Sequence, residues 1–409
     1  MRLLFLNQFF WPDLAPTSQL LTDVCDELAA QGHEVHVVCG RSAYMCETAR
    51  PKPKVNVIHA PAFRFSKGQG SRTLSYLSFL AGAAWKAWRA PKPDIVVSMT
   101  TPPLLSVLGG ALQRWHGARH YIWEMDMYPD VAVDTGLARA DDPLVRLLAW
   151  IAGRQRRRAD AVIALGECMK ERLIQAGAPA AQIRIAENWA DSRVIRAHER
   201  PLALPLTVVY PGNLGMAHDV ETLAEAIRLL ANSELVRFVF VGGGVGYERL
   251  REECRERGVN NAEFRPYEPL ESLAEGWLRN GHAGLVSQKT SCVGTVVPSK
   301  VYALMAAGLP LVYIGPPNAT PALTIERFHC GWRVDNGAGA DLVALLTGLA
   351  RHPESVRKAG RRARRAFEEN YDVPQGVRRV SQILGLASSV EGAAAQPARE
   401  RPAEASSAA

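Results

Sequence analysis

The chain has 409 residues, a length that suits two or three domains of about 150 residues each. Apolar residues make up 47% of it and charged residues 22%, so it can build hydrophobic cores and is not collagenous, a small disulfide scaffold or wholly disordered. Its 48 Lys and Arg exceed its 41 Asp and Glu, and the net charge of +7 favours anionic partners: phosphorylated metabolites, nucleic acid or an acidic membrane surface.

Short apolar strands alternate with amphipathic helices in the first half of the chain. Strands are predicted at residues 2–7, 34–39, 55–60, 94–99, 120–124 and 160–165. Helices are predicted at residues 74–88, 104–116 and 144–158, and a further helix places Leu20, Leu21, Val24, Cys25 and Leu28 on one face and ends at Gly32. This alternation is typical of a parallel sheet that is covered by helices on both faces.

The same pattern begins again after a polar segment at residues 191–205, which contains Pro201 and Pro205 and is interpreted as a hinge. Strands are predicted at residues 206–210, 236–241, 263–264, 283–286 and 311–314, and helices at 220–231, 248–258, 270–280 and 299–307. We therefore predict an α/β protein with two Rossmann-like, doubly wound parallel-sheet domains that face a central cleft, where ligands bind beyond the carboxyl ends of the strands.

The predicted domain limits are residues 1–195 and 206–370, followed by a C-terminal helix at 371–387 that returns to the first domain. Residues 388–409 consist mainly of Ala, Ser, Glu, Pro and Arg. Such a segment cannot bury enough apolar surface to fold, so a disordered tail is predicted.

Cysteine usage and hydropathy indicate a cytoplasmic protein. The seven cysteines are scattered, odd in number and without a Cys-x-x-Cys motif, which argues against a disulfide framework or a zinc site. No window reaches about 18 uninterrupted apolar residues, so no membrane-spanning helix is predicted.

A glycine turn follows the strand at residues 236–241. Gly242, Gly243, Gly244 and Gly246 would let backbone N–H groups approach a phosphate, or they are structural. The dinucleotide fingerprint requires a last glycine where this chain has Tyr247, and no acidic ribose clamp follows. A nicotinamide-dependent dehydrogenase is therefore disfavoured.

A second glycine loop leads into a helix that carries a lysine near its start. Gly294 precedes Pro298, which suits a first helical turn, and Lys300 adds a full positive charge to the helix N-terminus. An anion would dock there, unless this is an ordinary helix start with a solvated lysine. Gly212 and Asn213 end the first strand of the second half and leave room for the same ligand.

Three carboxylates follow the strand at residues 120–124: Glu124, Asp126 and Asp130. Acids at the edge of a cleft orient hydroxyl groups or act as bases, and two carboxylates alone are a weak signal for a metal. Alternatively, these carboxylates only cap helices and stabilise loop turns.

Several segments together resemble the family 4 glycosyltransferases, retaining enzymes of the GT-B architecture. The similarity is to the branch that assembles bacterial surface polysaccharides such as colanic acid or O-antigen. It is carried in order by residues 7–13 with 17–20, 32–35, 126–130, 188–191, 210–215 with 218–219, 264–267 and 298–310.

The resemblance implies a transferase of the hexosyl or N-acetylhexosaminyl type, with a nucleotide-diphosphate sugar as co-substrate, a glycan or polyprenyl-linked glycan acceptor, no cofactor and no strict need for a metal. Donor binding would fall to Gly212, Asn213, Arg265, Tyr267, Gly294, Thr295, Val296, Ser299 and Lys300. Catalysis would involve Asp126, Asp130 and Lys300, and the acceptor-side loop would contain Thr17 and Ser18.

The chain departs from the family pattern at two places. Most members carry two glutamates eight positions apart, where this chain has Thr295 and Ala303, so ribose must be bound differently. The usual Arg and Lys after the second-domain strand are Asn213 and His218. A catalytically silent partner in a polysaccharide assembly complex therefore stays open, as does a nucleotide-sugar epimerase or hydrolase.

Two helices suit attachment to the inner face of the cytoplasmic membrane. Residues 74–88 hold aromatic side chains beside basic ones, and residues 147–151 run into Arg154, Arg156, Arg157 and Arg158. We expect peripheral association that weakens at high salt, although the same helices also have to cover the sheet. The basic stretch at residues 351–365 lacks interleaved aromatics, so no nucleic-acid partner is expected.

Overall fold

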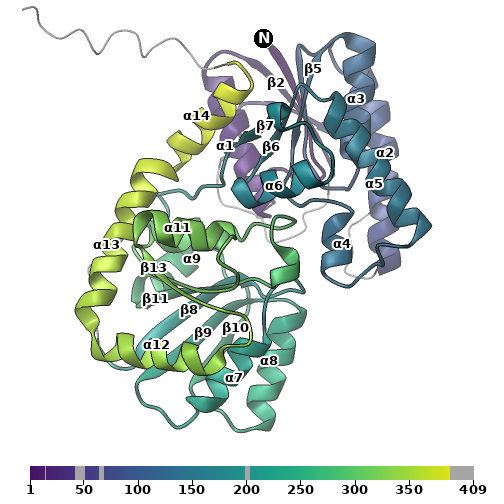
Figure 1. Cartoon of the computed structure of the whole chain (residues 1–409). Helices are drawn as coiled ribbons and strands as arrows, with labels where there is room; N and C mark the ends of the chain where they lie inside the picture. The colour runs from purple at the N-terminus through teal and green to yellow at the C-terminus, as the bar shows by residue number, and fades with distance from the viewer. Residues whose placement is uncertain (14, 42–50, 64–68, 199–202, 387–409) are drawn as a thin grey trace, which may run out of the picture.

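The computed structural model describes residues 1–13, 15–41, 51–63, 69–198 and 203–386. The predicted tail at 388–409 and Cys46 lie outside these residues. The described part folds around two separate parallel sheets, one in each half of the chain (Figure 1). The predicted α/β class with two Rossmann-like sheets is therefore confirmed.

The first sheet has seven strands in the order β3-β2-β1-β4-β5-β6-β7, with every neighbouring pair parallel. The strands are β1 (Arg2–Leu6), β2 (Glu34–Cys39), β3 (Asn56–His59), β4 (Ile95–Ser98), β5 (Arg119–Trp123), β6 (Ala161–Ala164) and β7 (Ile183–Ile185). β7 was not predicted, because three residues at the edge of a sheet carry too little apolar pattern.

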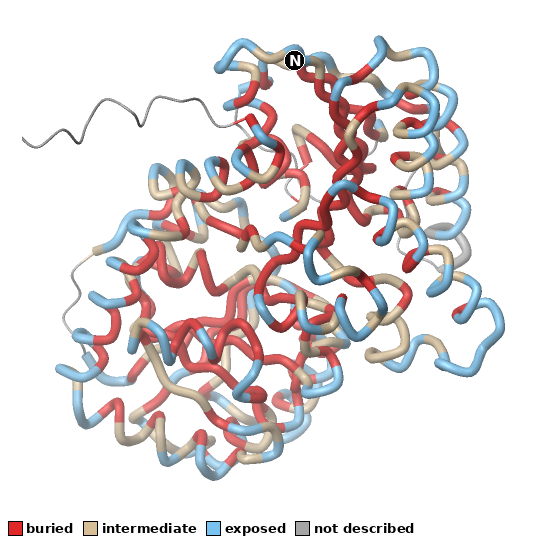
Figure 2. The backbone as a smooth tube through the Cα atoms, turned by 45° about the horizontal axis from the view of Figure 1, so that its top comes forward, coloured by how far each residue is buried: buried red, intermediate tan, exposed pale blue. Residues whose placement is uncertain are grey.

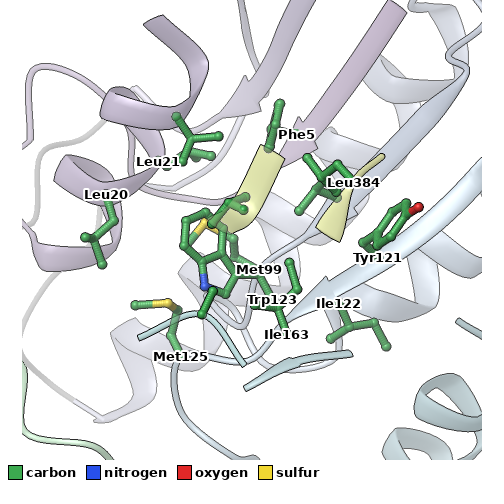
Figure 3. Close-up of a cluster of buried hydrophobic side chains, with 14 of the residues drawn as sticks. Phe5, Leu20, Leu21, Met99, Tyr121, Ile122, Trp123, Met125, Ile163 and Leu384 are labelled. Carbon is green, nitrogen blue, oxygen red and sulfur yellow. The ribbon is translucent and has the colours of Figure 1, made fainter. Parts of the chain in front are cut away.

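Helices cover both faces of this sheet. One face packs against α1 (Pro16–Ala30), α6 (Glu167–Gln175) and α14 (Val373–Ile383), and Figure 3 shows Leu384 in the same cluster as Phe5 and Trp123. The other face packs against α2 (Gln69–Arg89) and α3 (Leu105–His116), with α5 (Pro143–Arg158) beside α3. The central strands β1, β4, β5 and β6 are almost wholly buried between these layers (Figure 2), whereas the edge strand β3 is partly exposed.

The second sheet has six parallel strands in the order β10-β9-β8-β11-β12-β13. They are β8 (Leu206–Asn213), β9 (Val236–Gly243), β10 (Ala262–Arg265), β11 (Ala283–Ser287), β12 (Leu311–Ile314) and β13 (Gly331–Val334), of which β13 was not predicted. One face is covered by α7 (Glu221–Leu229), α8 (Val245–Glu256) and α12 (Gly339–Arg351), and the other by α10 (Lys300–Ala306), α11 (Thr320–Phe328) and α13 (Pro353–Asn370).

Shorter helical segments complete the described chain. They are α4 (Asp130–Asp134), α9 (Leu270–Leu273), η1 (Ala180–Gln182), η2 (Ala274–Leu278) and η3 (Thr290–Cys292). The single helix predicted at 270–280 is therefore α9 continued by η2, a turn of π-helix. No helix among the described residues is long and apolar enough to cross a membrane.

The end of the described chain connects the two halves. After α13, the Asp372 carboxylate accepts hydrogen bonds from the Ser192 backbone N–H (3.0 Å) and hydroxyl (2.6 Å). The next helix, α14, then packs on α1 and places Val377, Val380 and Leu384 in the core of the first sheet. The C-terminal helix thus lies on the first domain (Figure 1).

Candidate functional site

The two domains touch at residues that the sequence analysis predicted for the site of each domain. Asp126, just beyond β5, forms an antiparallel β-bridge with Val296, which lies just before α10. The next residue, Met127, donates its backbone N–H to the carbonyl of Thr295 at 2.9 Å. The acidic loop of the first domain and the glycine loop of the second are therefore in direct contact.

Lys300 is the first residue of α10 and is held inside the second domain. Its Nζ donates to the Tyr210 hydroxyl at 2.5 Å and to the Asn213 carbonyl at 3.1 Å. No carboxylate of the described residues lies within 4.0 Å of this ammonium group. Burial therefore holds the pKa of Lys300 well below its ordinary value of 10.5, and an anion bound beside it would favour its charged form.

His218 stands where the resemblance expects a lysine, and the structure places it near Lys300. Its Nδ1 lies 2.7 Å from the Ser287 carbonyl, and burial together with the nearby Lys300 charge lowers its pKa to about 3. His218 is therefore neutral at physiological pH and leaves the positive charge of the site to Lys300.

The glycine turn at Gly242–Gly244 serves the packing of two strand ends. A Cβ on Gly242 would lie 2.1 Å from the Gly212 carbonyl oxygen, and one on Gly244 would lie 2.2 Å from Asn213 Oδ1. The N–H groups of Gly246 and Tyr247 donate to the Leu214 carbonyl. The turn thus brings β8 and β9 together and sets Gly212 and Asn213 in place, with Gly212 at a φ of +89° that favours glycine.

The structure separates Arg265 from Tyr267. The Tyr267 side chain is 44% exposed and covers the glycine turn, because a Cβ on Gly243 would lie 3.1 Å from its ring. Arg265 instead pairs with Glu263 on its own strand and lies over the Trp277 ring. Of these two predicted donor-binding residues, Tyr267 is the one next to Gly243.

The predicted loop at Gly294–Ser299 belongs to the contact between domains. Gly294 has a φ of +80°, and a Cβ there would lie 2.5 Å from the Cys168 carbonyl oxygen of α6. The Thr295 side chain is buried, and the Val296 carbonyl accepts from Gln288 Nε2 at 2.9 Å. Ser299 precedes α10 without a side-chain capping hydrogen bond.

The first-domain acids have different surroundings. Glu124 forms a buried ion pair with Arg156 at 2.6 Å, with both side chains 4% exposed, so it has a structural partner. Asp126 is half-buried, and burial together with the neighbouring Glu124 charge raises its pKa to about 6. Asp126 is therefore the acid whose protonation changes near neutral pH.

Asp130 and Asp134 lie on α4 and share one arginine. Arg172 Nη2 lies 3.3 Å from Asp134 and 3.8 Å from Asp130. Ser291 of the second domain donates to the Asp134 carbonyl at 2.9 Å. This Asp134–Arg172–Ser291 contact was not predicted, since its members are separated by more than 30 residues.

Thr17 and Ser18 occupy the first turn of α1. Ser18 is fully buried, and its hydroxyl has no hydrogen-bond partner within the described part of the chain, whereas Thr17 is partly exposed. Within the described part of the chain, no hydrogen bond or ion pair joins either residue to Lys300 or Asp126. The geometry brings together Lys300, Asn213 and Gly212 on one side and Asp126 with Val296 on the other.

The described residues contain no group of three or more His, Cys, Asp or Glu side chains placed to hold a metal ion. A cavity of about 890 Å³ lies between α1 and α14, lined by residues that include Asp23, Lys54, Arg193, Asp372 and Arg378. None of the predicted site residues lines it.

Comparisons with known proteins support the interpretation of the chain as a two-domain glycosyltransferase. Residues 18–189 match the family model of the glycosyl transferase 4-like domain. The chain is 26% identical over 345 residues to the putative colanic acid biosynthesis glycosyl transferase WcaI of Escherichia coli, which covers 75% of this chain and 82% of that protein.

Two solved structures show the same two-domain arrangement. Sucrose-phosphate synthase from Thermosynechococcus elongatus superposes with a TM-score of 0.74 at 14% identity, over 94% of this chain and 98% of that one. HepE of Anabaena in complex with UDP-glucose gives a TM-score of 0.67 at 16% identity, over 94% and 99%. These solved structures show the GT-B fold for the chain, and the match over residues 18–189 shows that its first domain is glycosyl transferase 4-like.

Proposed function

We propose that this protein is a retaining glycosyltransferase that moves a sugar from a nucleotide-diphosphate donor to a glycan or polyprenyl-linked glycan in bacterial surface polysaccharide biosynthesis. The relative named for colanic acid biosynthesis supports the pathway class, and the UDP-glucose complex on the same fold supports the donor class. No metal is required in this proposal, because the chain supplies its own cation.

The observation that carries the proposal is the half-buried ammonium of Lys300, which has no carboxylate within 4.0 Å among the described residues. Removing a charge from water is costly unless an opposite charge compensates it. Lys300 has only neutral oxygens, those of Tyr210 and Asn213, as hydrogen-bond partners. A diphosphate seated beside Gly212 and Asn213 would supply the missing anion.

The chemistry follows from this charge. As the bond between the sugar and the diphosphate breaks, negative charge grows on the departing phosphate oxygen, and Lys300 stabilises it. Retention requires the acceptor hydroxyl to arrive on the face that the diphosphate leaves. Its proton then passes to the departing phosphate or to Asp126, whose pKa of about 6 suits a group that exchanges protons near neutral pH.

Donor binding is tested by thermal unfolding in the presence of UDP- and GDP-sugars. A donor that binds the folded state raises Tm by mass action. At a donor concentration of 100 times Kd, the free energy of unfolding increases by about 2.7 kcal/mol. We expect Lys300→Ala to abolish this rise. Lys358→Ala, which removes an exposed lysine of α13, should leave it unchanged.

The products separate the proposal from its alternatives. Transfer to a glycan acceptor with retained anomeric configuration, observed by NMR and insensitive to EDTA, is the expected result. Sugar release without an acceptor would indicate a hydrolase, and epimer formation an epimerase. If no nucleotide sugar shifts Tm, the protein is a silent partner and the proposal fails.

A further inference from the structure

The second sheet has its topological switch point between the neighbouring strands β8 and β11. From β8 the chain continues through α7 to β9, and from β11 it continues through α10 to β12, so the two connections run to opposite faces of the sheet (Figure 1). The carboxyl ends of the strands at such a point are where parallel sheets bind ligands. Lys289, which follows β11, joins the two connections, because its backbone N–H donates to the Ala217 carbonyl beyond β8 at 2.9 Å.

The backbone around Lys289 is fixed by side-chain hydrogen bonds on both sides. Before it, Gln288 Nε2 donates to the Val296 carbonyl at 2.9 Å. After it, the Thr290 hydroxyl donates to Asn336 Oδ1 at 2.7 Å, in the segment that follows β13. None of these bonds uses the Lys289 side chain. The loop therefore presents this side chain from a fixed position without needing it for its own structure.

Lys289 is a cation without an acidic partner. It is half-buried, and no carboxylate of the described residues lies within 4.0 Å of its ammonium group. The acids of the surrounding loops have partners elsewhere: Asp219 accepts from Thr222 and Asn336, Glu221 pairs with Arg249 at 2.8 Å, and Asp335 pairs with Arg333 at 2.5 Å. A partly desolvated charge is stabilised by an opposite charge beside it, so an anionic ligand is the partner that Lys289 lacks.

His218 lies near both Lys289 and Lys300. It follows Ala217, which Lys289 holds, and its ring contacts the Tyr210 ring edge-on at 6.1 Å between centroids. Lys300 Nζ lies 3.8 Å from the centre of the same Tyr210 ring. Burial, together with the charges of Lys300 and Lys289, lowers the pKa of His218 to about 3, so the imidazole adds no charge at neutral pH. The switch point therefore holds two lysines around a neutral ring.

We propose that Lys289 and Lys300 form a two-lysine clamp in which each ammonium group binds one phosphate of the donor diphosphate. The inference deepens the proposed function and rests on it, and it makes Lys289 a donor-binding residue. The diphosphate of a nucleotide sugar carries one negative charge on each phosphate, so the two lysines match its charge. A lysine ammonium group binds phosphate as a compact point charge with three donors.

The clamp gives the site a preference for two phosphates over one. Lys289 and Lys300 stand at the two ends of the connection from β11 to α10, and they contact the segment after β8 at two points, the carbonyls of Ala217 and Asn213. A diphosphate can engage both lysines, whereas a monophosphate leaves one of them without an anion. A carboxylate on the transferred sugar would also suit Lys289, but it would add a third negative charge, one more than the clamp supplies.

Nucleotide binding to the full chain, measured by isothermal titration calorimetry, tests the clamp. The wild type should bind UDP more tightly than UMP, or GDP more tightly than GMP. Lys289→Met should lower the diphosphate affinity about tenfold to a hundredfold, as expected for one charge-assisted contact, and should narrow the preference over the monophosphate. Lys289→Arg stays charged and should keep most of the affinity. Arg249→Met is the matched control, because Arg249 already has a carboxylate partner, and it should bind like the wild type.

A rescue measurement separates phosphate binding from a structural role. Mg²⁺ should recover part of the diphosphate affinity of Lys289→Met, because it returns positive charge to the phosphates, while the Tm of the variant without nucleotide stays at the wild-type value. The clamp is overturned if Lys289→Met lowers Tm and Mg²⁺ recovers nothing, or if only UDP-glucuronate binding is lost, which would place a sugar carboxylate at Lys289. If the wild type binds none of these nucleotides, the proposed function fails; if the wild type and Lys289→Met bind them equally, only the clamp fails.

Discussion

Lys300 Nζ lies 2.5 Å from the Tyr210 hydroxyl and 3.8 Å from the centre of the Tyr210 ring. The same hydroxyl donates to the Asn213 carbonyl at 3.2 Å. Tyr210 lies in the middle of β8 and therefore links Lys300 to Asn213, the last residue of the same strand. Burial lowers the pKa of Lys300 and raises that of Tyr210. The pair keeps the ammonium oriented without neutralising it.

Donor affinity should therefore depend on pH in the alkaline range. With its pKa lowered, Lys300 loses its proton as pH rises at values below its ordinary 10.5, and the neutral amine no longer attracts a diphosphate. We expect donor affinity to fall as pH rises through this range, with proton uptake on binding measurable by calorimetry in buffers of different ionisation enthalpy. Lys300→Arg stays charged and should flatten the profile. A flat profile in the wild type would contradict the assignment.

Asp126 should make folding less stable as pH rises. Its native pKa of about 6 exceeds its ordinary value of 3.8, so the native state binds this proton more tightly than the unfolded state does. The contribution of Asp126 to the free energy of unfolding is fully present below about pH 4 and is lost as pH rises through about 6. Asp126→Asn should match the wild type near pH 4, and at pH 8 its free energy of unfolding should exceed that of the wild type by about 3 kcal/mol, measured by urea unfolding.

The same variant tests the proposed catalytic role. We expect kcat to fall about a hundredfold, because an amide cannot accept a proton, while donor affinity in the thermal assay persists. Asp141→Asn, on an exposed loop, is the matched control and should change neither quantity. A stabilised Asp126→Asn with full activity would assign Asp126 a purely structural role.

Local patterns predicted the elements that carry the site. Apolar runs punctuated by glycine located β8, β9 and α10, and the spacing from Gly294 to Lys300 indicated an anion site whose lysine the structure places beside Asn213. These features depend on neighbours in sequence, so composition and periodicity suffice to find them.

Contacts between distant residues could not be predicted in this way. The sequence suggested that Glu124 faces the ligand, but Arg156, 32 residues away, pairs with it in the core. Gly294 was predicted to lie in a donor-binding loop, and the sequence did not indicate that its close approach to Cys168 of the other domain also demands a glycine. The π-helical turn at η2 likewise departs from the regular 3.6-residue period that predicted a single helix.

Substituting Gly294 should disturb the contact between domains. In Gly294→Ala, the methyl group would lie 2.5 Å from the Cys168 carbonyl oxygen, at a φ of +80° that disfavours alanine. Gly337 has nearly the same φ of +79° and open space around it, so Gly337→Ala measures the backbone cost alone. We expect a cost of about 1 kcal/mol at Gly337 and about 3 kcal/mol at Gly294, read from urea unfolding.

Small-angle X-ray scattering should show whether the larger destabilisation of Gly294→Ala comes from separation of the two domains. If the new methyl group separates the domains, the radius of gyration of Gly294→Ala should rise, and that of Gly337→Ala should not. Equal destabilisation of the two variants would mean that the contact with Cys168 carries no energy.

The buried pair of Glu124 and Arg156 should behave unlike an exposed one. Arg156→Met would leave the Glu124 carboxylate without its partner in the core and remove the bond to the Tyr128 carbonyl, at a cost of about 3–5 kcal/mol. Arg139→Met breaks a pair whose side chains are 84% and 70% exposed, and should cost under about 1 kcal/mol. Adding Glu124→Leu to Arg156→Met should restore much of the loss, since two apolar side chains leave no buried charge. Additive losses in a double-mutant cycle would show that the two residues act independently.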